Sequence, residues 1–169
     1  MAILNRPMKR AALFTLLAGL LAAPAVAGIT ATRGDGKLSV SDARGLVWLQ
    51  GRGAAIGRLD RGSITVTDLT PDDTSEPLVF GCNDERFRGA ALVCKGENVR
   101  YRLIGGMWRI SVLGRGIDLS AVAKGRVLLD GDGLRTGVYS TKGVDCRTEP
   151  EECEAVPEDE TSFVLGTAR

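Results

Sequence analysis

The residue types that most often carry catalysis are missing from this chain or unavailable in it. Its 169 residues include no histidine, which removes the commonest general base and the partner of serine or cysteine in nucleophilic triads. The four cysteines, Cys82, Cys94, Cys146 and Cys153, are expected to be oxidised, which removes a thiolate nucleophile. The sequence therefore predicts a protein that is not an enzyme of these classes.

The chemistry that remains for an enzyme is a pair of carboxylates, as in glycoside hydrolysis. Asp60, Asp68, Asp118 and Asp130 lie at the ends of expected strands. Their spacing does not single out two of them, and an acidic residue at a turn ordinarily serves solvation and backbone capping. A carboxylate-dependent glycoside hydrolase is therefore kept only as an alternative.

The most suggestive binding residue is Trp48. Val47 and Leu49 flank it at the two-residue period of a strand, so they face the core while Trp48 and Gln50 point outward. An exposed aromatic ring on a sheet can stack on a sugar or contact a protein. Trp108 lies near the equivalent place in the second half of the chain, though not in register. Trp48, Gln50 and Trp108 are the candidate binding residues, and a loop covering each tryptophan is the alternative.

No metal site or cofactor is predicted. Asp130 and Asp132 alternate with glycines as at the start of a calcium loop, but the glutamate that closes such a loop is missing and an Asp-Gly hairpin turn explains them better. The cysteines lack the close spacing of a zinc site. Arg52 and Arg115 each stand between two glycines, which favours solvated turn residues, with a paired anion site as the alternative.

The N-terminus has the three parts of a secretory signal peptide. A basic start, an apolar run over 11–23 and the small-residue site Ala25-Val26-Ala27 predict removal of residues 1–27. The apolar run is shorter than the ~20 residues that span a bilayer. The remaining chain is expected to be extracellular or periplasmic, with no transmembrane segment, and its even cysteine count predicts two disulfides. Proximity favours Cys82 with Cys94 and Cys146 with Cys153.

Charge argues against a nucleic-acid partner. The net charge of +1 includes three basic residues of the signal peptide, so residues 28–169 carry 1 − 3 = −2. Binding to nucleic acid needs a concentrated basic face, which a nearly neutral surface does not provide. The 142 residues that remain suit one domain.

Short alternating runs predict an all-β domain over 28–169. Leu38 with Val40, Val47 with Leu49, and Ile64 with Val66 each alternate with polar residues, and glycine-rich segments such as 51–62 separate the runs. A shift of 114 − 51 = 63 positions places the pattern of 46–68 on 109–131, which predicts two repeats, at about 36–98 and 99–169. About ten short strands in a β-sandwich or barrel are expected, with a short β-solenoid as the alternative.

These observations predict an exported, disulfide-stabilised β module for interaction with a protein or with the cell envelope. The Trp48 side of the sheet is the expected contact surface, and the partner is an unknown protein or an envelope glycan. The alternative is a carbohydrate-directed activity, either binding alone or hydrolysis by carboxylates.

Overall fold

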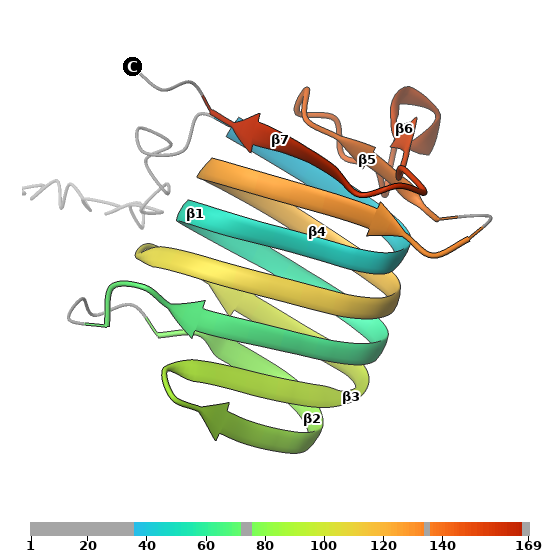
Figure 1. Cartoon of the computed structure of the whole chain (residues 1–169). Helices are drawn as coiled ribbons and strands as arrows, with labels where there is room; N and C mark the ends of the chain where they lie inside the picture. Colours follow the sequence, from blue (N-terminus) through green and yellow to red (C-terminus); the bar gives the residue numbers. More distant parts are fainter. Residues whose placement is uncertain (1–35, 72–75, 134–135, 167–169) are drawn as a thin grey trace, which may run out of the picture.

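The computed structural model describes residues 36–71, 76–133 and 136–166 (Figure 1). The predicted signal peptide, 1–27, lies outside these residues. The described chain is almost entirely β, with one turn of 3-10 helix, η2 (Pro150–Glu152). The strands are β1 (Gly36–Asp68), β2 (Leu78–Arg88), β3 (Ala91–Leu103), β4 (Met107–Gly131), β5 (Val138–Ser140), β6 (Glu154–Ala155) and β7 (Thr161–Leu165).

The fold is organised by β1 and β4, which wind around each other as an antiparallel pair (Figure 1). Each residue from Gly45 to Arg52 has a β4 neighbour on both sides: Val47, for example, lies opposite Val112 and also opposite Leu129. These two partners are 129 − 112 = 17 residues apart, so one turn of the winding takes 17 residues. The rest of the sheet extends from this pair in the order β2-β3-β1-β4-β7.

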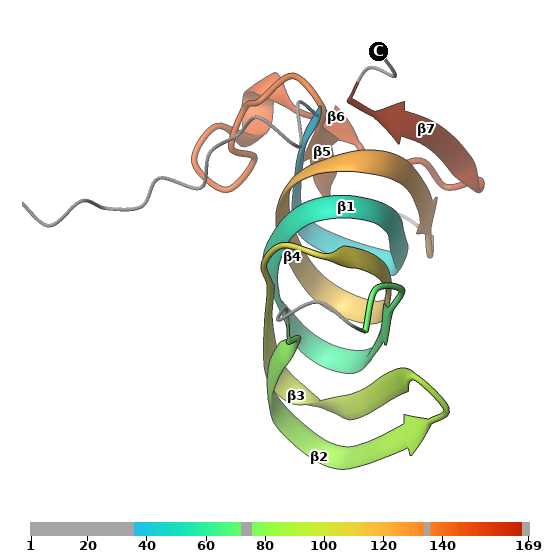
Figure 2. The ribbon, with the colours of Figure 1, turned by 90° about the vertical axis from the view of Figure 1, so that its left-hand side faces the viewer.

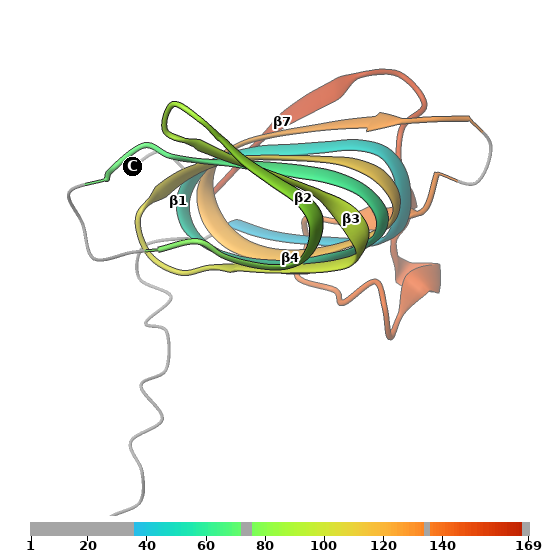
Figure 3. The same cartoon turned by 90° about the horizontal axis from the view of Figure 1, so that it is seen from below.

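Winding flattens the sheet into two layers around one core, as Figures 2 and 3 show. We call them the front and back layers after the view of Figure 1. The front layer contains β7 and the segments 124–131 and 107–114 of β4, 45–52 and 61–68 of β1, 91–97 of β3 and 82–88 of β2. The back layer contains β5, β6 and the segments 36–41 and 53–59 of β1, 117–123 of β4, 99–103 of β3 and 78–80 of β2.

Alternation along each segment fills the space between the layers with apolar side chains. Val47 and Leu49 of the front layer and Leu38 and Val40 of the back layer are all buried. Because neighbouring residues of a strand point to opposite faces, the residues between them lie on the outer surfaces. Residues from both predicted halves contribute to this single core cluster.

A row of glycines forms one of the two bends between the layers. Gly131, Gly45, Gly114, Gly62 and Gly96 are register partners across five neighbouring strand segments. An odd number of residues per turn cannot keep strict alternation, and the inward positions of β1 change from Ala55 and Leu59 to Ile64 and Val66 across this bend. Gly45, Gly62 and Gly114 have φ values of +121°, +149° and +156°, which side chains rarely permit.

The two ends of the wound sheet differ. At the top of Figure 1, β5, β6 and β7 cover the last turn, and Val156 and Leu165 are buried there. At the bottom, β2 forms the edge of the sheet. The predicted disulfides are present: Cys82–Cys94 joins β2 to β3, and Cys146–Cys153 closes a loop between β5 and β6.

The all-β prediction is confirmed, whereas the predicted strand lengths are wrong. The three runs expected as separate short strands are parts of β1, which continues through the glycines of 51–62 because glycine lets the backbone bend without ending the ladder. Neither a sandwich nor a barrel is confirmed, since the one sheet is wound and its path is not closed. The division into two sequence repeats remains a prediction.

Candidate functional site

The described surface is hollowed on the outside of the back layer. Two adjoining hollows of about 500 Å³ and 490 Å³ share Ile56, Arg102 and Ser120 in their walls. They form one continuous depression across β1, β4 and β3, which we call the outer groove. The groove lies outside the wound sheet and is separate from the filled core.

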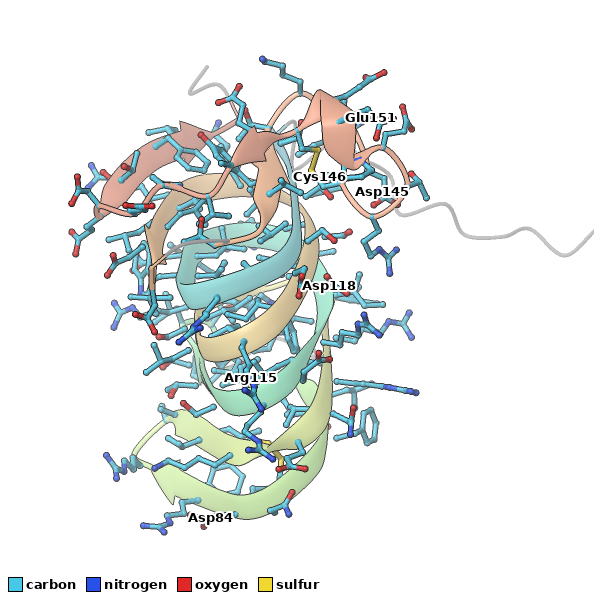
Figure 4. All side chains as sticks on the ribbon, turned by 90° about the vertical axis from the view of Figure 1, so that its right-hand side faces the viewer. Asp84, Arg115, Asp118, Asp145, Cys146 and Glu151 are labelled. Carbon is cyan, nitrogen blue, oxygen red and sulfur yellow. A yellow bond between two sulfur atoms is a disulfide. The ribbon has the colours of Figure 1, made fainter. Side chains whose placement is uncertain are left out.

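A loop forms one wall of the outer groove. Gly143, Val144, Asp145 and Arg147 line the hollows, and they belong to the segment that the Cys146–Cys153 disulfide closes. The backbone N–H of Cys146 donates to Ser39 Oγ at 3.0 Å, which holds the loop against β1. In Figure 4, Asp145 and Cys146 stand on the same side of the sheet as Asp118.

The floor of the groove is apolar. Ile56 is 56 % exposed and Ile104 is 38 % exposed, and Ala54 and Val122 lie beside them in the larger hollow. Leu78 and Phe80 of edge strand β2 extend the floor, because they are the register partners of Arg102 and Arg100. Four of the seven large hydrophobic side chains exposed in the described structure therefore lie on or next to this surface.

The rim of the groove is positively charged. The two hollows are lined by five basic residues and two acidic ones, which leaves 5 − 2 = 3 unbalanced positive charges. Arg58 is paired with Asp118 at 2.7 Å and Arg147 with Asp145 at 3.7 Å. Lys37, Arg100 and Arg102 are exposed and have no carboxylate within 4 Å among the described residues.

Asp118 is the best-anchored polar side chain of the groove. It is only 6 % exposed and accepts three hydrogen bonds: from Arg58 Nε at 2.7 Å, the backbone N–H of Asp42 at 2.9 Å and Ser41 Oγ at 3.3 Å. Asp42 has a φ of +51° at the irregularity where β1 leaves the regular register. The hydrogen bond from Arg58 to Asp118 also raises the pKa of that guanidinium. Asp118 therefore fixes the shape of the groove.

Tyr101 packs under the floor, and its ionisation should make the fold sensitive to alkali. Its hydroxyl donates to the backbone oxygen of Asp118 at 3.3 Å. Burial, with a smaller effect from the Asp118 charge, raises the pKa of Tyr101 above its ordinary value. The unfolded chain loses this proton near pH 10 while the folded chain keeps it, so stability falls as pH rises above about 10, by at most ~1.4 kcal/mol per pH unit.

Urea unfolding of the wild type and of Tyr101→Phe between pH 8 and pH 11 measures this effect. We expect the wild type to lose stability more steeply than the variant above pH 10. Equal slopes would show that Tyr101 does not carry the alkaline sensitivity.

The chain was compared with family models, curated proteins and solved structures. None of the three comparisons found a match. Among the described residues there is also no helix with the length and apolar character needed to cross a membrane. Function must therefore be argued from the surfaces themselves.

The structure places Trp48 and Gln50 on the front layer, on the face opposite the outer groove. Val47 and Leu49 are buried, so the predicted orientation of this strand is confirmed. Trp48 is half-buried beside Ser111 and Leu128, and Gln50 Oε1 accepts a hydrogen bond from Arg109 Nε at 3.1 Å. The two residues remain candidates for binding, but they do not belong to the groove.

Trp108 must be withdrawn as a binding residue. It is 3 % exposed and belongs to the core cluster, and its indole N–H donates to the backbone oxygen of Gly105. A ring with both faces packed offers no surface to a ligand. The prediction was wrong because Trp108 has the same strand parity as the inward-facing Ile110 and Val112, whereas Trp48 has the outward parity.

The remaining sequence candidates lie apart from one another. Asp118 is held by Arg58, the side chain of Asp68 accepts from the backbone N–H of Thr70, and Asp132 pairs with Arg44 at 3.5 Å. No cluster of three or more metal-ligating side chains is found within 36–71, 76–133 and 136–166. Arg115 is the register partner of Arg44 and Arg61 at the glycine-row bend, whereas Arg52 lies opposite Met107 and Lys124. They do not form the paired anion site that was considered for them.

Sequence reasoning missed the outer groove, although part of its signal was present. Ile56 stands one position from buried Ala55 and three from buried Leu59, but it falls in the segment that was interpreted as a loop. Leu78 and Phe80 are the outward positions of a run that was recognised as a strand without a face being assigned. The covering loop gave no signal, because its contact with Ser39 joins residues 146 − 39 = 107 positions apart.

Proposed function

We propose that the chain is an exported, non-catalytic binding module of the cell envelope, and that its outer groove binds the acyl chain of an anionic lipid. The observation that carries this proposal is the juxtaposition of an apolar floor, Ile56 with Ile104, and the unpaired cations Lys37, Arg100 and Arg102. Apolar contact drives burial of a hydrocarbon chain, and the cations complement its acidic head group.

Export is supported by the predicted signal peptide together with the two disulfides, which persist in oxidising compartments. A non-catalytic role is supported by the absence of histidine from the sequence. The groove thus replaces the Trp48 side as the main contact surface of the interaction that the sequence predicted.

A peptide suits the middle of this groove less well than a hydrocarbon chain. Ile56 and Ser120 lie on strand segments that are paired on both sides, so no free strand edge is available to a peptide backbone there. Each peptide unit buried on the apolar floor without a hydrogen bond would cost free energy. A hydrocarbon chain has no such groups.

Fluorescence titration with cis-parinaric acid, a fluorescent long-chain fatty acid, tests the proposal on the chain beginning at residue 28. We expect saturable binding that Ile56→Asp weakens at least about tenfold, because a carboxylate on the floor would be buried against hydrocarbon and repel the head group. Arg102→Glu should weaken binding as well, and the methyl ester of the probe should bind less tightly than the acid.

Leu113→Asp is the matched control, because Leu113 is 55 % exposed on the front layer and Ile56 is 56 % exposed in the groove. Thermal unfolding of each variant shows whether it is folded. Equal binding by Ile56→Asp, Leu113→Asp and the wild type would refute the proposal. So would tighter binding of an extended peptide of alternating leucine and glutamate, which would make the groove a protein-docking surface.

A further inference from the structure

A second surface, on the front layer, combines one aromatic ring with a group of cations. Trp48, Gln50 and Arg52 occupy successive outward positions of β1, and the register places Arg109 and Arg126 on either side of Gln50. Lys124 lies opposite Arg52. We call this set of six residues the Trp48 face: Trp48, Gln50, Arg52, Arg109, Lys124 and Arg126.

The cations of the Trp48 face lack counter-charges. Arg52, Arg109, Lys124 and Arg126 are exposed, and none of them has a carboxylate within 4 Å in the described parts of the chain. The set contains no acidic residue. Four positive charges therefore gather on a chain whose residues 28–169 carry a net charge of −2, which gives this face a local preference for anions.

The shape and polarity of the face restrict the kind of anion. Trp48 presents part of its ring between Ser111 and Leu128, and the hollows found on the described surface do not include it. A flat site with one aromatic platform suits the face of a sugar ring, which packs its C–H groups on the indole. The Gln50 amide, already aligned by Arg109 Nε at 3.1 Å, can donate to a sugar hydroxyl.

We infer that the Trp48 face binds an acidic polysaccharide, one whose sugars carry carboxylates. Trp48 stacks on one sugar, and Arg109 and Arg126, about 10 Å apart across the two strand spacings that flank Gln50, meet carboxylates on either side. Arginine is suited to this role because its planar guanidinium can hold a carboxylate through two parallel hydrogen bonds. This site is independent of the outer groove, which lies on the other layer.

Isothermal titration with an oligogalacturonide, a linear chain of uronic acid sugars, tests the inference. We expect binding that weakens with added salt and that falls at least about tenfold in Trp48→Ala and in the double variant Arg109→Gln, Arg126→Gln. A neutral maltooligosaccharide of the same length should bind much more weakly. Arg88→Gln is the matched control, since it removes one exposed cation of the front layer near the β2–β3 turn, away from this face.

Trp48→Phe keeps the inference falsifiable if Trp48→Ala is poorly folded. It retains a ring and leaves buried Trp108 as the only tryptophan, so the ligand-induced change in tryptophan fluorescence should disappear while weakened binding persists. Unchanged affinity in Trp48→Phe and in the arginine double variant would overturn the inference. So would tighter binding of a single-stranded oligothymidylate of equal charge, which would identify the face as a site for nucleic acid.

Discussion

Replacing Gly62 by alanine should lower the free energy of unfolding by about 3 kcal/mol or more, because backbone strain and a steric clash act together. Gly62 has a φ of +149°, a region that is essentially closed to side chains. A Cβ atom there would press on the backbone oxygen of Leu113 and lie 2.8 Å from the Cα of Gly114. Both atoms belong to the paired β4 strand, so the ladder itself would have to open.

Gly89→Ala separates these two causes. Gly89 also has a positive φ, +60°, but a Cβ added there meets nothing within 4 Å. It should cost only about 1 kcal/mol, the price of the left-handed conformation alone. Chemical denaturation of both variants measures the difference, and equal losses would show that close packing of the strands at the glycine row is unimportant.

Asp118→Ala is expected to destabilise the chain by about 3 kcal/mol, because it leaves several hydrogen-bond donors without their acceptor. The backbone N–H of Asp42 and the hydroxyl of Ser41 both depend on this carboxylate, and they lie where β1 bends away from the regular register. The same change should weaken binding of parinaric acid, because Arg58 and the groove wall lose their anchor.

Two other variants show which contacts of Asp118 carry the effect. Asp132→Ala breaks a pair with Arg44 whose side chains are 73 % and 58 % exposed, and such a surface pair should cost below about 1 kcal/mol. Arg58→Ala should also cost little, because the Arg58 side chain is 62 % exposed and water replaces its partner. If Arg58→Ala matched Asp118→Ala in unfolding experiments, the ion pair and not the backbone contact would be responsible.

The sequence contained most of the information about which residues face the core. Alternation correctly placed Val47, Leu49, Ile64 and Val66 inside, and proximity correctly paired the cysteines. The same residues also hold the 17-residue period of the winding, because Val47 and Ile64 are 64 − 47 = 17 positions apart, as are Ile110 and Val127. This shorter period was overlooked in favour of the 63-residue similarity.

The course of the strands through the glycines could not be predicted from local patterns. A glycine-rich segment usually indicates a turn, and only the pairing of Gly45, Gly62 and Gly114 with one another shows that the ladder continues through them. The outer groove depended in addition on the long-range contact between Cys146 and Ser39. Such contacts are set by the tertiary fold and leave no periodic signal in the sequence.

The two registers of β1 against β4 also govern how this architecture tolerates insertions. A segment added to β1 alone would leave its new residues without partners, since every β1 residue of the middle turn needs β4 on both sides. Matched insertions of one 17-residue turn in each strand would keep both the glycine row and the inward positions aligned. They would lengthen the molecule by about 9.6 Å, two strand spacings. The fold can therefore grow only by whole turns, and its two outer surfaces would be extended together.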